Sequence, residues 1–162
     1  MHLLIPAAGS VRRIGSQRNK LLLTLLGKPL LSWTLAAAEA SGQISWIGIM
    51  GQPGDFPDFQ GILKDLSAKK PIELIQGGAT RQESVYNGLQ ALPPNADRVL
   101  IHDGARCLAT PELFDRAADA LLSCPGLIVA VPVKDTIKVV DEARIVRDTP
   151  ERSNLWAAQT PQ

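Results

Sequence analysis

Short apolar runs alternate along the chain with segments whose apolar residues recur at helical spacing. Five runs have the length and composition of buried strands, at residues 3–5, 44–50, 71–75, 99–102 and 127–133. Glycine, serine and proline interrupt the chain where one element would end and the next begin. This rhythm predicts an α/β fold of Rossmann-like type, with a mainly parallel twisted sheet and helices on both of its faces.

Two of the expected helices begin with capping signals. Thr80 and Glu83 stand three residues apart after the third apolar run, the spacing of a capping box. Thr110 follows the fourth run and precedes Pro111 and Glu112, so proline occupies the first helical position and an acid lies in the first turn. Both signals predict helix starts close to the ends of strands.

The first apolar run ends in small residues followed by cations. Pro6, Ala7, Ala8 and Gly9 allow a ligand to approach the backbone closely, and exposed N–H groups can bind phosphate oxygens. Arg12, Arg13 and Lys20 come next and can neutralise the remaining charge. The pattern predicts a loop that binds a polyphosphate. An ordinary glycine-containing turn with solvated basic residues is the alternative for this loop considered alone.

Other unusual residues follow the third and fourth strands. Residues 77–84 and 103–106 concentrate glycine, aspartate and arginine, and parallel strands bring such loops to one edge of the sheet, where ligands bind. A Gly-x-Gly-x-x-Gly dinucleotide motif is absent, because Val11 stands where its second glycine would be. Gly-Lys-Ser/Thr is absent too. A dehydrogenase and an ATPase of the P-loop class are therefore disfavoured.

Composition and charge narrow the classes further. The 162 residues are 45% hydrophobic and 20% charged, which suits one domain with a sizeable core. A net charge of +1 gives no case for nucleic acid as a partner. Cys107 and Cys124 form no CxxC pair, and no apolar run reaches membrane-spanning length. The first strand begins close to Met1, so we expect no signal peptide. We expect a cytoplasmic protein without a membrane or nucleic-acid partner.

The segment from residue 135 to 153 differs from the rest. Residues 136–140 and 144–147 look like two strands joined by the polar turn Asp141-Glu142. An isolated arm of this kind leaves its edges unpaired in a monomer, and a second copy of the chain would cover them. We expect a core at 1–134, a β-arm for dimerisation and substrate contact at 135–153, and a return to the core at 154–162.

A family resemblance emerges from ordered motifs. The motifs are Pro6-Ala7-Ala8-Gly9 with Arg12, Arg13 and Lys20, then Gly27-Lys28-Pro29-Leu30, Gly77-Gly78 with Arg81, Ser84 and Val85, His102-Asp103-Gly104-Ala105-Arg106, residues 132–138, Arg152, and residues 155, 156 and 160–162. Together they span the chain, which resembles the 2-C-methyl-D-erythritol 4-phosphate cytidylyltransferases of the non-mevalonate isoprenoid route.

The resemblance implies transfer of CMP from CTP to 2-C-methyl-D-erythritol 4-phosphate, with release of pyrophosphate. A substrate phosphate oxygen would attack the α-phosphorus in line, so the protein supplies positioning and charge neutralisation. Arg13, Lys20 and Arg152 take the catalytic positions, and Asp103 would bind Mg²⁺. The implied nucleotide-binding residues are Pro6, Ala7, Ala8, Gly9, Gly78, Arg81, Ser84, Asp103, Gly104 and Ala105.

The same resemblance assigns the arm. It implies a homodimer in which Thr136, Lys138 and Arg152 contact the polyol phosphate in the neighbour's site. Two other functions stay open at this point. One is a cytidylyltransferase that uses ribitol 5-phosphate, and the other is a catalytically silent nucleotide-binding or dimerisation module.

Several positions carry further expectations. Val11 replaces a glycine and Asn19 a proline that are usual in the resembled family, so we expect residues 10–19 to be disordered without nucleotide. His102 is expected to be a hydrogen-bonding residue at a strand end, and Arg106 an orienting partner of Asp103. The family continues beyond Thr-Pro-Gln, so the chain ending at Gln162 is expected to be truncated.

Overall fold

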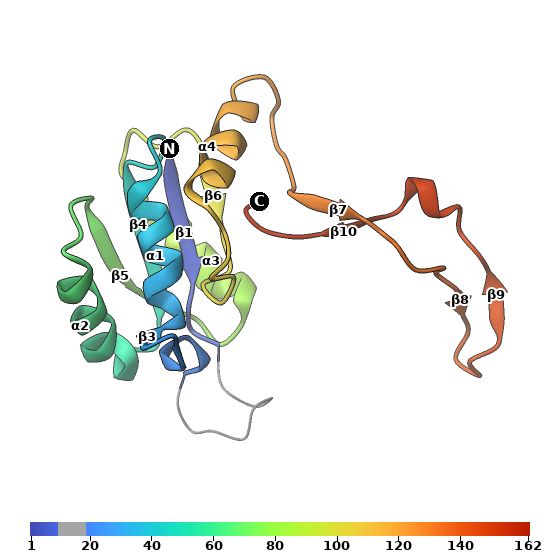
Figure 1. The fold of residues 1–162 in the computed structure, drawn as a ribbon, viewed down its shortest axis with the longest axis horizontal. Helices are drawn as coiled ribbons and strands as arrows, with labels where there is room; N and C mark the ends of the chain where they lie inside the picture. Colours follow the sequence, from blue (N-terminus) through green and yellow to red (C-terminus); the bar gives the residue numbers. More distant parts are fainter. Residues whose placement is uncertain (10–18) are drawn as a thin grey trace.

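Four parallel strands form the central sheet of the computed structural model, which describes residues 1–9 and 19–162. The strands are β1 (His2–Pro6), β4 (Trp46–Gly51), β5 (Ile72–Gln76) and β6 (Val99–Ile101), in the order β5-β4-β1-β6 (Figure 1). Every residue of β4 is buried, as expected for a central strand covered on both faces. The predicted α/β fold with a parallel sheet is confirmed.

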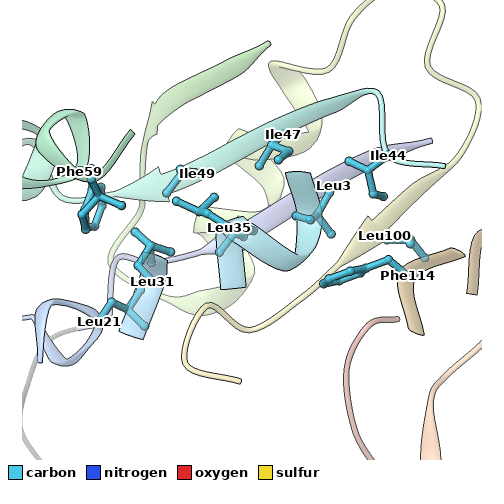
Figure 2. Close-up of a cluster of buried hydrophobic side chains, with 14 of the residues drawn as sticks. Leu3, Leu21, Leu31, Leu35, Ile44, Ile47, Ile49, Phe59, Leu100 and Phe114 are labelled. Carbon is cyan, nitrogen blue, oxygen red and sulfur yellow. The ribbon is translucent and has the colours of Figure 1, made fainter. Parts of the chain in front are cut away.

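Helices cover both faces of this sheet because side chains alternate along each strand. Leu3 and Ile5 point to the face covered by α1 (Leu30–Ala40), α2 (Phe56–Leu66) and α4 (Pro111–Ala120). Figure 2 shows the resulting cluster, in which side chains from β1, β4 and β6 meet Leu35, Phe59 and Phe114.

The other face is covered by α3 (Arg81–Gln90), which packs on β1 and β4. Leu4 and Met50 form the core there. A Cβ on Gly88 would lie 2.7 Å from the Met50 sulfur and 3.0 Å from Leu4. Glycine therefore lets α3 approach the sheet closely enough to place its N-terminus beside the strand ends.

The fifth strand expected at residues 127–133 does not join the central sheet. Only β7 (Ala130–Pro132) forms there, and it pairs antiparallel with β10 (Trp156–Ala158) in a separate two-stranded sheet. Gln162 lies along β6 instead, and its N–H and C=O exchange hydrogen bonds with Ile101 at 3.0 and 2.8 Å. Because the returning chain pairs with β6, β7 is left to pair with β10.

The core also contains the 3₁₀ turns η1 (Lys20–Leu22) and η2 (Pro53–Asp55) and the two-stranded ribbon of β2 (Thr24–Leu25) and β3 (Lys28–Pro29). A third 3₁₀ turn, η3 (Arg152–Asn154), lies outside the core and precedes β10 (Figure 1). Gly27 turns this ribbon with φ of 79°. The motif Gly27-Lys28-Pro29-Leu30 therefore begins at this turn and continues through β3 into α1.

The arm is a hairpin that extends away from the core (Figure 1). Strands β8 (Val139–Val140) and β9 (Val146–Asp148) pair antiparallel, as predicted. The Asp141 carboxylate accepts hydrogen bonds from Ile145 N at 2.9 Å and Arg147 Nε at 2.7 Å. The Ile145 backbone bond, followed by the Arg147 side chain, lowers the pKa of Asp141.

Across residues 1–9 and 19–162, every helix is too short or too polar to cross a bilayer.

Candidate active site

A cavity of ≈ 840 Å³ opens at the carboxyl ends of the parallel strands. The loops that follow β1, β4, β5 and β6 all reach it, because parallel strands end at one edge. Its described lining includes Lys20 and each residue predicted to bind nucleotide, namely Pro6, Ala7, Ala8, Gly9, Gly78, Arg81, Ser84, Asp103, Gly104 and Ala105. Residues that sequence reasoning collected from separate loops thus share one cavity.

The loop after β1 is held by its backbone. Ala7 N donates to Met50 O at 2.7 Å, and Ala7 O accepts from Asn19 Nδ2 at 2.7 Å. The Ala7 N–H is therefore already paired, which leaves the second lone pair of its carbonyl for a ligand. Ala8 O lies 3.5 Å from Gln52 Nε2, a cavity residue that sequence reasoning did not identify.

The loop after β1 forms one wall of the cavity, and the start of α3 with the turn before it forms the second wall. Thr80 Oγ1 accepts from Glu83 N at 3.0 Å, which confirms the capping interaction. The Glu83 carboxylate accepts from Ala79 N at 2.8 Å, one residue before the position a standard capping box uses. A Cβ on Gly78 would lie 2.2 Å from the Glu83 side chain, so this tight turn requires glycine.

Ser84 connects this turn to the cavity from a buried position. Its Oγ accepts from Gly78 N at 3.0 Å and donates to Thr80 O at 2.9 Å. A hydroxyl has one donor hydrogen and two acceptor lone pairs, so one lone pair of Ser84 remains for a ligand. The Ser84 oxygen can consequently accept a hydrogen bond from a bound molecule.

Asp103 is held between two guanidinium groups. Arg81 Nη2 lies 3.2 Å from one carboxylate oxygen, and Arg106 Nε lies 3.4 Å from the other. Arg106 Nη1 also donates to Gln159 Oε1. The expected pairing of Arg106 with Asp103 is confirmed, whereas the pairing with Arg81 was not predicted. These ion pairs are partly exposed, so they orient the groups more than they stabilise the fold.

Asp103 is also the residue that would hold Mg²⁺ in the cavity. Among the described lining residues Asp103 is the one carboxylate, and the described residues contain no group of three or more His, Cys, Asp or Glu side chains placed for a metal. Mg²⁺ commonly binds through one or two carboxylates, substrate phosphates and water. Asp103 fits that pattern as a single protein ligand beside a phosphate-bearing substrate.

His102 supports Asp103 from the core. Its ring is fully buried and contacts the Phe114 ring edge-on, with the two ring centroids 5.0 Å apart. Its Nδ1 lies 3.0 Å from Thr160 Oγ1. Thr160 Oγ1 also accepts from Asp103 N at 3.2 Å. Burial lowers the pKa of His102, which keeps the ring neutral. The strand-end role expected for His102 is confirmed, and Thr160 is a supporting residue that the sequence did not reveal.

The family model IspD, described as 2-C-methyl-D-erythritol 4-phosphate cytidylyltransferase, matches residues 1–162. The chain belongs to this family. It is 74% identical to the 2-C-methyl-D-erythritol 4-phosphate cytidylyltransferase of Trichodesmium erythraeum, and the match covers all of this chain and 72% of that one. It is 72% identical to the protein of the same name from Crocosphaera subtropica, and the match covers all of this chain and 71% of that one.

A solved structure agrees in fold. The 4-diphosphocytidyl-2C-methyl-D-erythritol synthase of Anaerococcus prevotii superposes with a TM-score of 0.88 at 32% identity, covering 99% of this chain and 68% of that one. The family resemblance stated from the motifs is therefore confirmed. The fold and the order of the motifs together place this chain among the cytidylyltransferases.

Of the predicted catalytic cations Arg13 and Lys20, the structure describes only Lys20. Lys20 lines the cavity at the start of η1, whereas Arg13 lies outside the described residues, as do residues 10–18 of the segment expected to be disordered. Asn19, the last residue of that segment, is described. It is buried and makes hydrogen bonds to Ala7, Asp55 and Leu21, which does not match the disorder expected for this position.

The residues predicted to bind the polyol phosphate lie on or next to the arm. Thr136, Lys138 and Arg152 are outside the lining of the cavity. Arg152 Nη1 donates to Lys134 O at 2.9 Å, and Lys138 Nζ donates to Thr149 Oγ1 at 2.8 Å. A single copy of the chain thus keeps these three residues apart from the cavity.

Proposed function

We propose that the cavity binds CTP and 2-C-methyl-D-erythritol 4-phosphate and transfers CMP from the first to the second. Family membership over residues 1–162 supports the reaction. The observation that carries the proposal is the convergence of Lys20, Arg81 and Asp103 with small-residue backbone loops in one cavity. That combination of cations, a hard carboxylate and close backbone suits a nucleoside triphosphate.

The substrate brings its own nucleophile. An oxygen of the polyol phosphate forms a bond to the α-phosphorus of CTP, the bond from that phosphorus to the bridging oxygen of the β-phosphate breaks, and pyrophosphate leaves with the electron pair. Lys20 neutralises charge on the triphosphate, together with Arg13. Mg²⁺ held by Asp103 would neutralise phosphate charge and orient the phosphates.

Base selection is assigned to the second wall of the cavity. The remaining lone pair of Ser84 Oγ is an acceptor, and the exocyclic amino group of cytosine is a donor. Uracil presents a carbonyl oxygen in place of that amino group, which would face another acceptor. A purine would meet the walls formed by Ala8 and Gly78. Ser84 therefore favours CTP over UTP.

A homodimer completes the polyol site in this proposal. Val139, Val140 and Val146 leave apolar surface exposed on the arm, which is the kind of surface that a second copy covers. Thr136, Lys138 and Arg152 would then reach the partner's cavity and bind the substrate phosphate. The arm at 135–153 thus acts as a dimerisation and substrate unit between the core and the returning residues 154–162.

A cytoplasmic location is part of the same proposal. Cys107 and Cys124 are both free thiols, which suits a reducing compartment. The proposed substrates are small anionic metabolites.

Pyrophosphate release tests the reaction. The full chain is incubated with CTP, MgCl₂ and 2-C-methyl-D-erythritol 4-phosphate, and release is compared with that for ribitol 5-phosphate and for UTP. We expect release with the first substrate pair and little with the others. Release with ribitol 5-phosphate alone would assign a different polyol, and release with neither polyol phosphate would favour the silent module.

A further inference from the structure

Asn19 is a buried polar residue whose amide group is almost fully used. Its Nδ2 donates to Ala7 O at 2.7 Å and to Asp55 Oδ2 at 2.7 Å, and its Oδ1 accepts from Leu21 N at 3.1 Å. Ala7 O and Asp55 Oδ2 are both acceptors, so the atom of the Asn19 amide that faces them must be the nitrogen. The side chain therefore joins the end of β1, the 3₁₀ turn η2 and the backbone of η1.

Lys20 is the residue that this arrangement affects most directly. It follows Asn19 in the chain, begins η1 and lines the cavity, while Ala7 lines the cavity from the end of β1. Asp55 does not line the cavity, and its only side-chain hydrogen bond within the described residues is to Asn19. Among residues 1–9 and 19–162, the hydrogen bonds of the Asp55 side chain therefore connect it to the cavity lining through Asn19.

We infer that Asn19 and Asp55 form a positioning pair that holds η1 against the end of β1 and so fixes Lys20 at the triphosphate. The inference rests on the proposed function of Lys20. Asn19 itself lines the cavity, but its amide is committed to three contacts within the protein, so its role in this inference is to position Lys20. A buried amide with three partners sets one arrangement of η1, because each alternative arrangement leaves a buried polar group unpaired.

Asn19→Asp tests this pair with almost no change of shape. The substitution replaces a donor by a carboxylate oxygen facing Ala7 O and Asp55, so attraction becomes repulsion at two contacts. We expect the dissociation constant of CTP, measured by calorimetry, to rise about tenfold or more.

The decisive comparison is a double-mutant cycle with Lys20→Met. If Asn19 acts by positioning Lys20, Asn19→Asp weakens CTP binding much less in the Lys20→Met background than in the unchanged chain. Equal weakening in both backgrounds would overturn the inference, because it would show that the effect does not pass through Lys20. Unchanged CTP affinity in Asn19→Asp itself would overturn it as well.

Two further variants guard against loss of folding. Asp55→Ala removes one partner of Asn19 from outside the cavity, and we expect it to weaken CTP binding in the same direction as Asn19→Asp. Asn87→Asp is the matched control, since Asn87 Nδ2 also donates to a backbone carbonyl, Gln76 O at 3.0 Å, but lies off the cavity lining. We expect it to leave CTP binding unchanged.

The readouts separate this inference from the proposed function. CTP binding without pyrophosphate release in the unchanged chain would contradict the proposed reaction, while the cycle would still test the positioning pair. Pyrophosphate release with additive effects of Asn19→Asp and Lys20→Met would leave the reaction standing and remove the pair.

Discussion

Lys20 is the described residue on which charge neutralisation in the cavity most depends. It sits at the start of η1, beside a backbone that Asn19 and Leu21 hold in place. The sequence predicted its role from its distance to the small-residue loop. The sequence could not reveal the hydrogen bond between Asn19 and Asp55, because these residues are separated by 36 positions and meet only in the folded chain.

Replacement of Lys20 by Met keeps most of the aliphatic side chain and removes its charge. We expect kcat/KM for CTP to fall about 100-fold, the size of effect seen when a single stabilising group is lost from a developing anion. Lys69→Met is the control, because Lys69 is exposed and is not among the residues that line the cavity. A value for Lys20→Met within the error of the unchanged chain would contradict the assignment.

His102 predicts a specific dependence of stability on pH. Its pKa in the folded chain lies below the ordinary value of 6.5, chiefly because the ring is buried. The unfolded chain therefore binds a proton at higher pH than the folded chain does. With respect to His102, the free energy of unfolding should be highest above pH 6.5 and should fall as the pH drops below that value.

His102→Asn tests this prediction because asparagine can keep a partner for Thr160 without titrating. Chemical denaturation between about pH 7.5 and about pH 5 should show a smaller loss of stability for the variant than for the unchanged chain. Parallel pH profiles for both proteins would contradict the role of His102.

Among the elements, α3 matters most for the site, because its first turn forms a wall of the cavity. The sequence predicted this helix start from Thr80 and Glu83 alone. The sequence could not fix how close the helix lies to the sheet, since that depends on Gly88 meeting Leu4 and Met50 across the core. The pairing of β7 with β10 was missed for a similar reason, because it depends on where the returning chain meets β6.

Thr80→Ala removes the hydrogen bond that caps α3. We expect the free energy of unfolding to fall by about 1 kcal/mol, measured by urea denaturation. We also expect KM for CTP to rise, because Ser84 and Gly78 depend on the same turn. Thr110→Ala is the control, since Thr110 begins α4 without a side-chain hydrogen bond to the helix backbone. Equal loss of stability in both variants would contradict the capping role of Thr80.

At the scale of the whole molecule, the core and the arm divide the proposed work. The core of residues 1–9 and 19–134 brings the nucleotide residues together within one chain. The arm extends away from the core (Figure 1). Thr136 and Lys138 are outside the lining of that cavity, and the strands of the arm expose apolar side chains. The hairpin was predictable from its alternating pattern and polar turn. A second copy of the chain as the partner of the hairpin stays a prediction, which rests on the unpaired strand edges and the exposed apolar residues.

Val140→Asp combined with Val146→Asp places like charges on the exposed faces of β8 and β9. We expect the unchanged chain to be a dimer and this variant a monomer in light scattering, with pyrophosphate release reduced along with dimer formation. Leu122→Asp is the control, because it changes an exposed apolar residue after α4, outside the arm. A monomeric unchanged chain that is fully active would contradict the proposed dimer.

The crystal structure of the full chain with CTP and Mg²⁺ tests the central claim most directly. We predict that the cytosine lies between the loop of Ala8 and the turn of Gly78, with its amino group on Ser84 Oγ. The triphosphate should then extend past Lys20 towards Asp103. A nucleotide bound away from the cavity, or one whose phosphates avoid Lys20 and Asp103, would contradict the proposed site.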